Sequence, residues 1–125
     1  PYRCFVGPDG RLPFMAMPDA VRALLDLAKA DRARLTTCVY NVGAFSLSAM
    51  QIAERVRKAF PAAKIDYVPD EARGAIVASW PEDVDDARAR ADWGWAPSFN
   101  WDKAFDEYLV PRVTAKYARA ATALP

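Results

Sequence analysis

Histidine is absent from this sequence of 125 residues, and glycine and cysteine are scarce, with five and two residues. Without histidine, neither a Ser-His-Asp nor a Cys-His nucleophilic system can be built from this chain alone. The glycines never approach the GxGxxG or GxxxxGK[ST] spacing of loops that hold nucleotide phosphates. Cys4 and Cys38 lack the CxxC spacing of zinc sites, and we expect both to be inert, buried thiols. The sequence therefore predicts no metal site and no catalytic residue within the chain.

An excess of one charge and long apolar runs are also missing. Lys and Arg number 17 against 16 Asp and Glu, and the basic residues form no cluster of five or more. The formal net charge of +1 argues against a nucleic-acid surface. No apolar run approaches the ~20 residues that cross a bilayer, and no secretory signal is visible. We expect a soluble, cytoplasmic protein with neither a membrane nor a nucleic acid as partner.

The composition that is present, 53% hydrophobic and 26% charged, is typical of one globular domain. Strand and helix patterns alternate, which favours an α/β arrangement with helices laid on a sheet. Strands are expected at residues 2–6, 12–17, 38–42 and 64–68, and helices at 19–30, 48–60, 83–92 and from about 100 onward, bent at Pro111. We expect the first two strands to form a hairpin around the turn at 7–10, and residues 71–80 to form a loop.

Capping residues mark the helix boundaries. Ser48 is placed to cap one helix, and Asp19 is placed as the cap or as a first-turn acid of another. Gly94, between Trp93 and Trp95, resembles a C-terminal cap with hydrophobic contacts.

Two residues in the irregular segment 71–80 are candidates for ligand binding. Trp80 has no obvious place on a core face, so it either lines a pocket or packs beneath the loop. Arg73 either grips a carboxylate or phosphate in a bidentate way or lies exposed. Asp85 and Asp86 suggest a carboxylate pair for acid–base chemistry, but the helix dipole explains acids at a helix start equally. The sequence by itself thus predicts residues that line a pocket but no reactive group within it.

Five blocks of the sequence, in this order and spacing, resemble a known family. They lie at residues 2–6, 12–20, 40–42, 79–81 and 85–95. Together they are similar to the C-terminal portion of the epimerase-like L-threonine 3-dehydrogenases, which are extended short-chain dehydrogenase/reductases. The Ser-Trp-Pro block and the Asp-Asp-x-x-Ala-Arg-x-Asp-Trp-Gly-Trp block point to threonine dehydrogenases within the wider epimerase/dehydratase group. The resemblance runs roughly from Tyr2 to Tyr117.

The resemblance implies a longer enzyme, of which residues 1–125 form a single partial domain, the substrate-binding C-terminal lobe. Such an enzyme has an N-terminal Rossmann domain with a glycine-rich NAD turn, and a Tyr-x-x-x-Lys pair whose tyrosine is the general base. None of the five tyrosines here has a lysine four residues on, so we expect the chain alone to be inactive. The family reaction moves the C3 hydride of L-threonine to NAD and yields 2-amino-3-oxobutyrate. A homodimer assembled mainly through the absent domain is also implied.

Carried over residue by residue, Trp80 is expected to lie against the threonine pocket and to close it from water. Arg73 matches a family arginine shortly before that block. Ala16 stands where the family commonly has an aromatic residue, and Ala78 stands where an acid usually precedes Ser-Trp-Pro. Both departures affect the geometry in which the substrate is expected to bind. Residues 40–42 correspond to a strand of the family's main parallel sheet, so an isolated copy would expose a sheet edge.

Two alternatives stay open. Within the superfamily, the chain also fits part of a nucleotide-sugar epimerase or dehydratase in which Arg73 holds the diphosphate. Outside the enzymes, it fits a free-standing binding or assembly module that lacks the nucleotide domain. Activity of the complete protein with L-threonine or with a UDP-sugar separates the two enzymes, and cooperative unfolding of the 125-residue chain alone favours the module.

Overall fold

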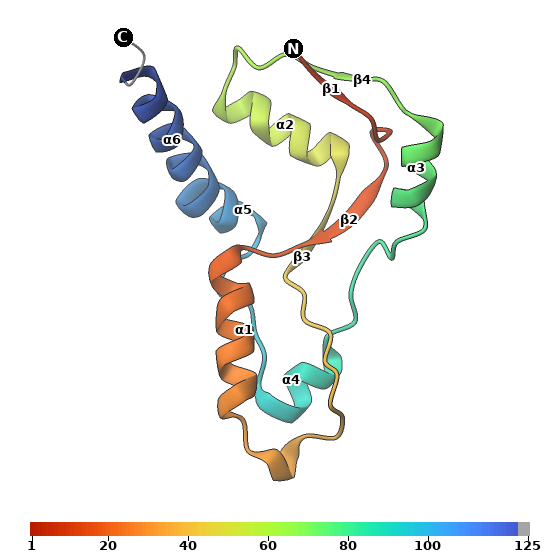
Figure 1. The fold of residues 1–125 in the computed structure, drawn as a ribbon, viewed down its shortest axis with the longest axis vertical. Coiled ribbons are helices and arrows are strands. Elements are labelled where there is room, and N and C mark those ends of the chain that lie inside the picture. Colours follow the sequence, from red (N-terminus) through yellow and green to blue (C-terminus); the bar gives the residue numbers. More distant parts are fainter. Residues whose placement is uncertain (123–125) are drawn as a thin grey trace. The chain divides into compact units, whose positions relative to one another are not determined.

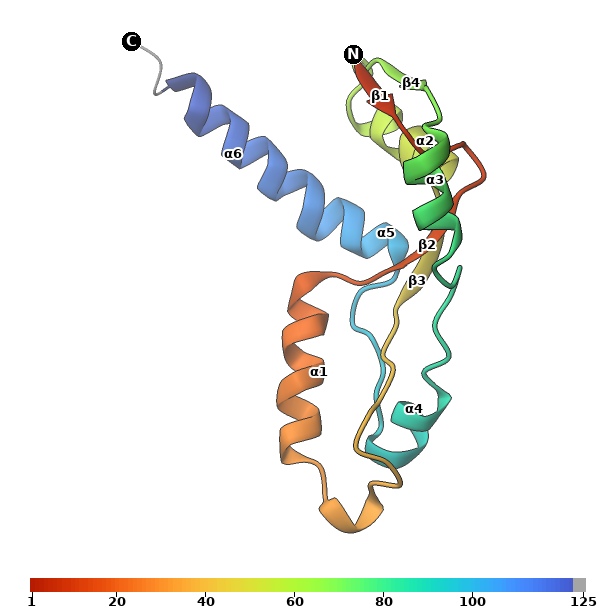
Figure 2. The same ribbon diagram turned by 45° about the vertical axis from the view of Figure 1, so that its right-hand side comes forward.

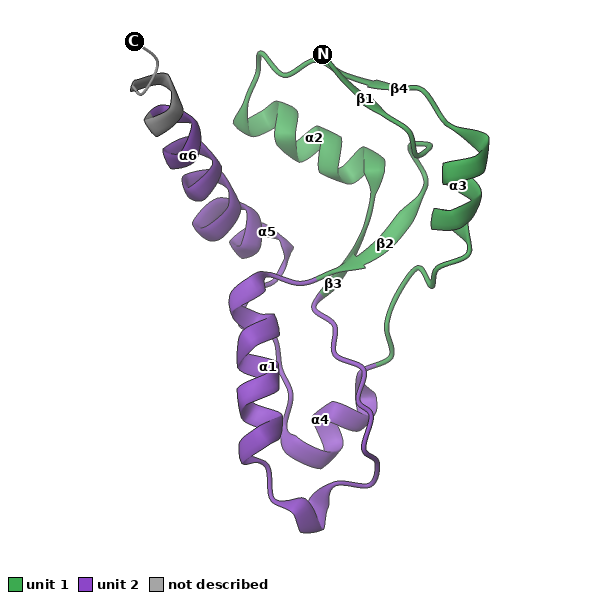
Figure 3. Cartoon of the chain, in the orientation of Figure 1, with its two compact units in different colours: residues 1–14, 45–85 green, residues 15–44, 86–125 purple. Residues whose placement is uncertain are grey.

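The computed structural model describes residues 1–122, which contain both helices and short strands (Figure 1, Figure 2). The chain divides into two compact units (Figure 3). Unit 1 contains Pro1–Phe14 and Phe45–Asp85, and unit 2 contains Met15–Ala44 and Asp86–Pro125. Each unit is therefore assembled from two stretches that lie far apart in the sequence.

The strands that the structure describes lie in unit 1 and form two pairs. β1 (Tyr2–Cys4) pairs in parallel with β4 (Ile65–Tyr67), and β2 (Arg11–Phe14) pairs antiparallel with β3 (Phe45–Ser48). In the second pair, Arg11 lies opposite Ser48 and Phe14 lies opposite Phe45. Alternating strands and helices confirm the α/β class that the sequence predicts.

The expected hairpin between the first two strands is wrong, although its turn is present. Gly10 donates its N–H to the carbonyl of Gly7 at 3.0 Å, but β1 and β2 each pair with a strand from later in the chain. A local hairpin would leave the backbone groups of β3 and β4 without these partners. Long-range pairing therefore replaces the local one.

Helix α2 (Ala49–Ala59) begins at the cap that the sequence predicts. Ser48 Oγ accepts the N–H of Gln51 at 3.2 Å, and Gln51 Oε1 accepts the N–H of Ser48 at 2.9 Å, which completes a capping box. The helix ends at Phe60, immediately before Pro61.

Helix α3 (Glu71–Ala78) occupies most of the segment 71–80, so the expected loop is wrong. The carboxylate of Asp70 caps the helix by accepting the N–H of Arg73 at 2.9 Å. None of the residues in α3 is buried, and Gly74 lies in its interior. The sequence therefore shows no apolar periodicity there, and it contains a residue that disfavours helix.

Unit 2 is built around Trp95, which packs with Ala23 and Ala89. Helix α1 (Met17–Lys29) supplies Ala23, and helix α4 (Ala87–Trp93) supplies Ala89. A short 3-10 helix, η1 (Arg32–Arg34), follows α1. Four partly buried residues complete this cluster: Met15, Tyr40, Val42 and Trp93.

The strand expected at residues 38–42 is wrong, and so is the expected burial of Cys38. These residues form no strand, and Val39 is 74% exposed. Cys38 is exposed and Cys4 is half-buried. A strand needs a neighbour for its backbone N–H and C=O groups, and within residues 1–122 all strands belong to unit 1.

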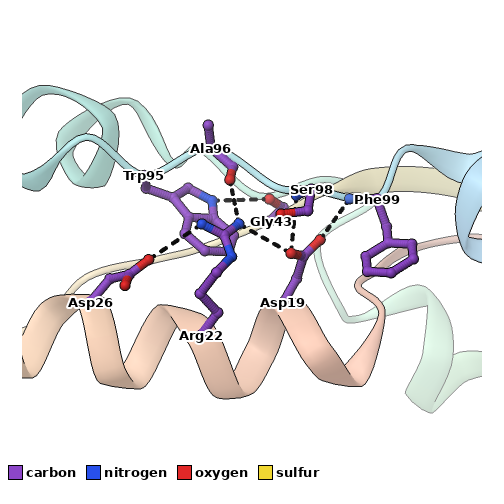
Figure 4. Close-up of polar contacts among 8 residues, drawn as sticks. All are labelled: Asp19, Arg22, Asp26, Gly43, Trp95, Ala96, Ser98 and Phe99. Carbon is purple, nitrogen blue, oxygen red and sulfur yellow. Dashed lines mark hydrogen bonds and ion pairs between the residues drawn. The ribbon is translucent and has the colours of Figure 1, made fainter.

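The carboxylate of Asp19 joins α1 to the segment that follows α4, and we call these contacts the Asp19 junction (Figure 4). Asp19 is 1% exposed, and its two oxygens accept the N–H groups of Ser98 at 3.0 Å and Phe99 at 2.9 Å. Arg22 adds an ion pair at 3.1 Å and lies over the ring of Trp95. Burial opposes ionisation of Asp19, but the two backbone hydrogen bonds and Arg22 hold its pKa below the ordinary value. Its expected place as a first-turn acid is confirmed.

Helix α4 starts later than the sequence indicates, at Ala87. Asp86 stands at the cap position, but its carboxylate binds the Arg90 guanidinium at 2.6 and 2.7 Å instead of the helix backbone. At the other end Gly94 has a φ of 75°, in the left-handed region, which confirms the predicted C-terminal cap.

A helical rod ends the described chain (Figure 2). It comprises α5 (Trp101–Lys103), the π-helical segment η2 (Ala104–Leu109) and α6 (Val110–Thr122). Asn100 caps the rod by accepting the N–H of Lys103 at 2.9 Å. The wider π turns lie just before Pro111, which has no N–H and whose ring would crowd the carbonyl of Glu107 in a regular α-helix. No helix within residues 1–122 is both long and apolar enough to span a membrane.

Gly10 has no room for a methyl group. A Cβ there would lie 2.3 Å from Val6 Cγ1 and 3.3 Å from the carbonyl oxygen of Gly7, whereas a Cβ at Gly74 would meet nothing within 4 Å. We expect Gly10→Ala to lower the free energy of unfolding by about 1–3 kcal/mol through overpacking. The matched control, Gly74→Ala inside α3, should leave it unchanged or raise it by up to about 1 kcal/mol. Urea unfolding followed by circular dichroism measures both, and equal effects would contradict this packing.

Loss of the Asp19 carboxylate should destabilise unit 2. Asp19→Ala removes the acceptor of two backbone N–H groups and one partner of Arg22, so we expect a loss of about 2–4 kcal/mol in the free energy of unfolding. Asp26 pairs with the same Arg22 at 3.3 Å on a more exposed side, and Asp26→Ala should cost less than about 1 kcal/mol. Denaturant titration of both variants is the measurement, and a similar cost for the two would be the contrary result.

The stabilisation from Asp19 should also depend on pH. Because its pKa in the folded state is lowered, the ionised carboxylate favours folding above the unfolded pKa of about 4, and this contribution is lost as pH falls through the folded pKa. The difference in unfolding free energy between the wild type and Asp19→Ala should be constant from about pH 5 to 8 and should shrink below about pH 4. This subtraction removes the contributions of the other carboxylates, and a difference that does not change with pH would argue against an ionised Asp19.

Candidate functional site

A cavity of about 240 Å³ lies in unit 1 beside Trp80, and we call it the Trp80 cavity. Its wall comes from the turn after β1, the start of β2, the end of α3 and the residues after α3. The lining residues are Val6, Gly7, Gly10, Arg11, Gly74, Val77, Ala78, Trp80 and Glu82. Small and apolar residues are thus combined with one tryptophan, one arginine and one glutamate.

The C-terminal turn of α3 positions Trp80. Ser79 donates its N–H to the carbonyl of Ala75 at 3.1 Å, and Trp80 donates its N–H to the carbonyl of Val77 at 3.1 Å. Pro81 follows, and it cannot continue the helix. Because Trp80 is 55% exposed, it lines a cavity and does not pack beneath a loop as a core residue.

The structure does not bring Arg73 into the Trp80 cavity. Its guanidinium carbon lies 3.6 Å from the centroid of the Phe5 ring, and the residue is exposed. Gly74, the next residue, lines the cavity instead. Across the residues that the structure describes, no carboxylate pairs with Arg73, so its N–H groups stay available to an anion.

Arg11 and Glu82 carry the charges of the cavity, and sequence reasoning missed both. Arg11 donates from Nη1 to the carbonyl of Ser46 at 2.8 Å and from Nη2 to Gln51 Oε1 at 3.2 Å. The carbonyl of Glu82 accepts a hydrogen bond from the Ser46 hydroxyl. The position of Arg11, between a glycine turn and an apolar strand, could have marked it as a binding residue in the sequence. No local pattern marks Glu82 in this way.

The two departures from the family pattern lie in different units. Ala78 lines the Trp80 cavity, at the position where the resemblance leads us to expect an acid. Ala16 is buried in unit 2, at the N-cap of α1. Ala78 is thus the departure that changes the surface of the cavity.

A larger cavity of about 570 Å³ lies in unit 1 between β1, β4 and α2. Its lining is almost entirely apolar and comprises Pro1, Tyr2, Cys4, Ala49, Ile52, Ala53, Val56, Ala63, Lys64, Ile65 and Tyr67. Lys64 is the one charged residue of this wall. Convergent polar groups are what give a site its specificity, so the Trp80 cavity is the better candidate.

Carboxylates of unit 2 with shifted pKa values have structural partners. Hydrogen bonds at 2.6 Å from the hydroxyls of Thr36 and Tyr40 lower the pKa of Asp92. Hydrogen bonds from Arg90 lower the pKa of Asp86. These hydrogen bonds account for the lowered pKa values of both carboxylates, so the shifts do not indicate a role in acid–base chemistry. In the described part of the chain, no three His, Cys, Asp or Glu residues come close enough together to hold a metal ion.

No protein-family model matches the chain, but individual known proteins are similar to it. The mitochondrial L-threonine 3-dehydrogenase of Bos taurus is 38% identical over 99 residues, which are 79% of this chain and 26% of the bovine protein. An uncharacterized epimerase/dehydratase of Staphylococcus saprophyticus is 34% identical over 100 residues, which are 79% of this chain and 31% of that protein.

A solved structure agrees with these relatives. The GalE-like L-threonine dehydrogenase from Cupriavidus necator, in its holo form, superimposes with a TM-score of 0.80 and 40% identity, over 86% of this chain and 35% of that one. The present chain therefore spans between about a quarter and a third of the length of these three proteins. The resemblance found in the sequence is confirmed: the chain is a partial homologue of the L-threonine 3-dehydrogenase and epimerase/dehydratase family of extended short-chain dehydrogenase/reductases.

Proposed function

We propose that this chain is the substrate-binding, C-terminal part of an NAD-dependent oxidoreductase that acts on L-threonine. The position of Trp80 carries the proposal, because this residue of the Ser-Trp-Pro block, which resembles threonine dehydrogenases, lines a cavity. Two of the three relatives above are named as L-threonine dehydrogenases, which supports the same substrate. The remaining part of a longer protein would supply the NAD site, the general base and the surface of a homodimer. Location in the cytoplasm stays a prediction.

The residues of this chain do not fit the nucleotide of NAD. A dinucleotide site places a glycine-rich turn between a strand and the N-terminus of a helix. Here the glycine turn at 7–10 leads from β1 into β2, and Gly74 lies inside α3. We therefore assign NAD binding to another part of a longer protein, and we expect the 125-residue chain alone to be inactive.

Within the Trp80 cavity, the chain contributes binding and exclusion of water. The indole of Trp80 offers a flat apolar surface, and covering this surface with substrate removes apolar area from water. Gly7, Gly10 and Ala78 keep the neighbouring wall small. The cavity therefore suits a compact substrate that lies against the indole.

A nucleotide-sugar epimerase or dehydratase is the alternative function. The S. saprophyticus relative is named as an epimerase/dehydratase. Arg73, stacked on Phe5 and exposed, is free of carboxylate partners among residues 1–122 and would bind the diphosphate.

A chimera distinguishes the two functions. In the C. necator enzyme, the segment that this chain matches is replaced by residues 1–125, and NADH formation is followed with L-threonine, alongside conversion of a UDP-sugar. We expect oxidation of L-threonine and no conversion of the UDP-sugar. Cooperative thermal unfolding establishes that the chimera is folded. A folded chimera that converts the UDP-sugar alone would support the epimerase, and one that converts neither substrate would remove both functions.

Trp80→Ala in an active chimera should raise the KM for L-threonine about tenfold, because loss of about 1.4 kcal/mol of apolar contact corresponds to that factor. Steady-state kinetics with varied L-threonine is the measurement. Ile76→Ala is the matched control, since Ile76 is 59% exposed on the same helix and does not line the cavity. If both variants keep the KM of the parent chimera, Trp80 does not belong to the substrate site.

A further inference from the structure

Two opposite charges line the Trp80 cavity without pairing with each other. Arg11 and Glu82, two residues of opposite charge, belong to the same wall. In the part of the chain that the structure describes, no ion pair joins them, and neither pairs with another charged side chain. Each therefore stays able to bind a group of opposite charge on a ligand.

Two hydrogen bonds hold the Arg11 guanidinium in place and use only part of its N–H donors. Its contacts with the carbonyl of Ser46 at 2.8 Å and with Gln51 Oε1 at 3.2 Å fix the guanidinium. Gln51 is itself fixed, because its side chain accepts the N–H of Ser48 in the capping box of α2. A guanidinium has five N–H donors, and the others find no acceptor among the described residues. Arg11 thus presents a positioned, half-buried fork of donors.

Ser46 contacts both residues. Its carbonyl accepts from Arg11, and its hydroxyl donates to the backbone carbonyl of Glu82. Glu82 is thereby tied to β3, and its exposed carboxylate has no hydrogen-bond partner within residues 1–122. One strand residue therefore contacts the guanidinium of Arg11 and the backbone of Glu82, two residues that line the cavity with Trp80.

We propose that the Trp80 cavity binds the charged end of a free α-amino acid, with Arg11 on its carboxylate and Glu82 on its ammonium group. A free amino acid carries both groups on one carbon atom, so two opposite charges in one small cavity match it. Arginine binds a carboxylate through two parallel N–H···O bonds, and a carboxylate accepts from an ammonium group. A volume of about 240 Å³ has room for one such molecule. This assignment rests on the proposed function and names how the substrate is recognised.

The same charges disfavour a diphosphate within the Trp80 cavity. A diphosphate carries only negative charge, so the Glu82 carboxylate would repel it in the Trp80 cavity. Sugar hydroxyls need neither a guanidinium nor a carboxylate. The charge pair therefore selects for a zwitterion.

Binding of charge-deleted ligands tests the assignment in the chimera, once cooperative unfolding establishes that it is folded. L-threonine, N-acetyl-L-threonine, which lacks the ammonium group, and L-threoninol, which lacks the carboxylate, are titrated while the amide NMR signals of Gly7, Gly10 and Gly74 are followed. We expect L-threonine to bind about tenfold more tightly than either analogue, since one charge-assisted contact is lost in each.

Variants of the two charged residues should each remove one of these preferences. Glu82→Gln should weaken L-threonine about tenfold and leave N-acetyl-L-threonine unchanged, and Arg11→Gln should weaken L-threonine and leave L-threoninol unchanged. Arg11→Lys retains the positive charge but not the fork of donors, so it should weaken L-threonine less than Arg11→Gln does and leave L-threoninol unchanged, and it tests Arg11 if Arg11→Gln fails to fold. Asp9→Asn is the control, because Asp9 is an exposed acid of the adjacent turn that does not line the cavity.

The outcomes separate this inference from the proposed function. No signal shift with L-threonine, or equal affinities of the wild type and both charge variants, would overturn the charge-pair site even if the chimera oxidises L-threonine. If the chimera fails to oxidise L-threonine but the variants show the expected ligand preferences, the charge-pair site stands and the oxidoreductase is wrong.

Discussion

The antiparallel pairing of β3 with β2 is the interaction on which the rest of unit 1 depends. Alternate residues of a strand point to opposite faces: Leu47 is buried, while the serines on either side of it make polar contacts. Ser48 starts α2, and Ser46 holds Arg11 and the backbone of Glu82. The four residues of β3 and their register with β2 thus position the start of α2, one core side chain, and the contacts of Arg11 and Glu82 at the Trp80 cavity.

Unit 2 depends on directional polar contacts because its apolar cluster is small. Two of the three residues at the centre of that cluster are alanines, packed on Trp95. Carboxylates connect the surrounding segments: Asp19 binds the backbone of Ser98 and Phe99, and Asp92 binds Thr36 from a distant part of the chain. Hydrogen bonds of this kind fix one arrangement of segments where alanine packing alone would tolerate several.

Local signals in the sequence predicted the features that depend on near neighbours. Ser48 needs only Gln51 to form its cap, so the start of α2 was predicted correctly. The predictions of a hairpin and of a strand at 38–42 were wrong because strand pairing depends on segments far away in the chain. Helix α3 was predicted as a loop because it buries no face and so leaves no apolar pattern in the sequence. At the candidate site, the Ser-Trp-Pro block pointed to Trp80, whose role in binding stays a prediction, whereas Arg11 and Glu82 come to the same cavity only through the fold.

Because each unit joins an early stretch to a late one, the order of synthesis separates partners in time. β1 and β2 leave the ribosome before β3 and β4 exist, and Asp19 is made long before the backbone of Ser98 and Phe99 that it binds. At about 5–20 residues per second, these waits last several seconds. Unit 1 is complete once Asp85 has emerged, so it is the first that can close, while α1 stays without its partners and open to chaperones for longer.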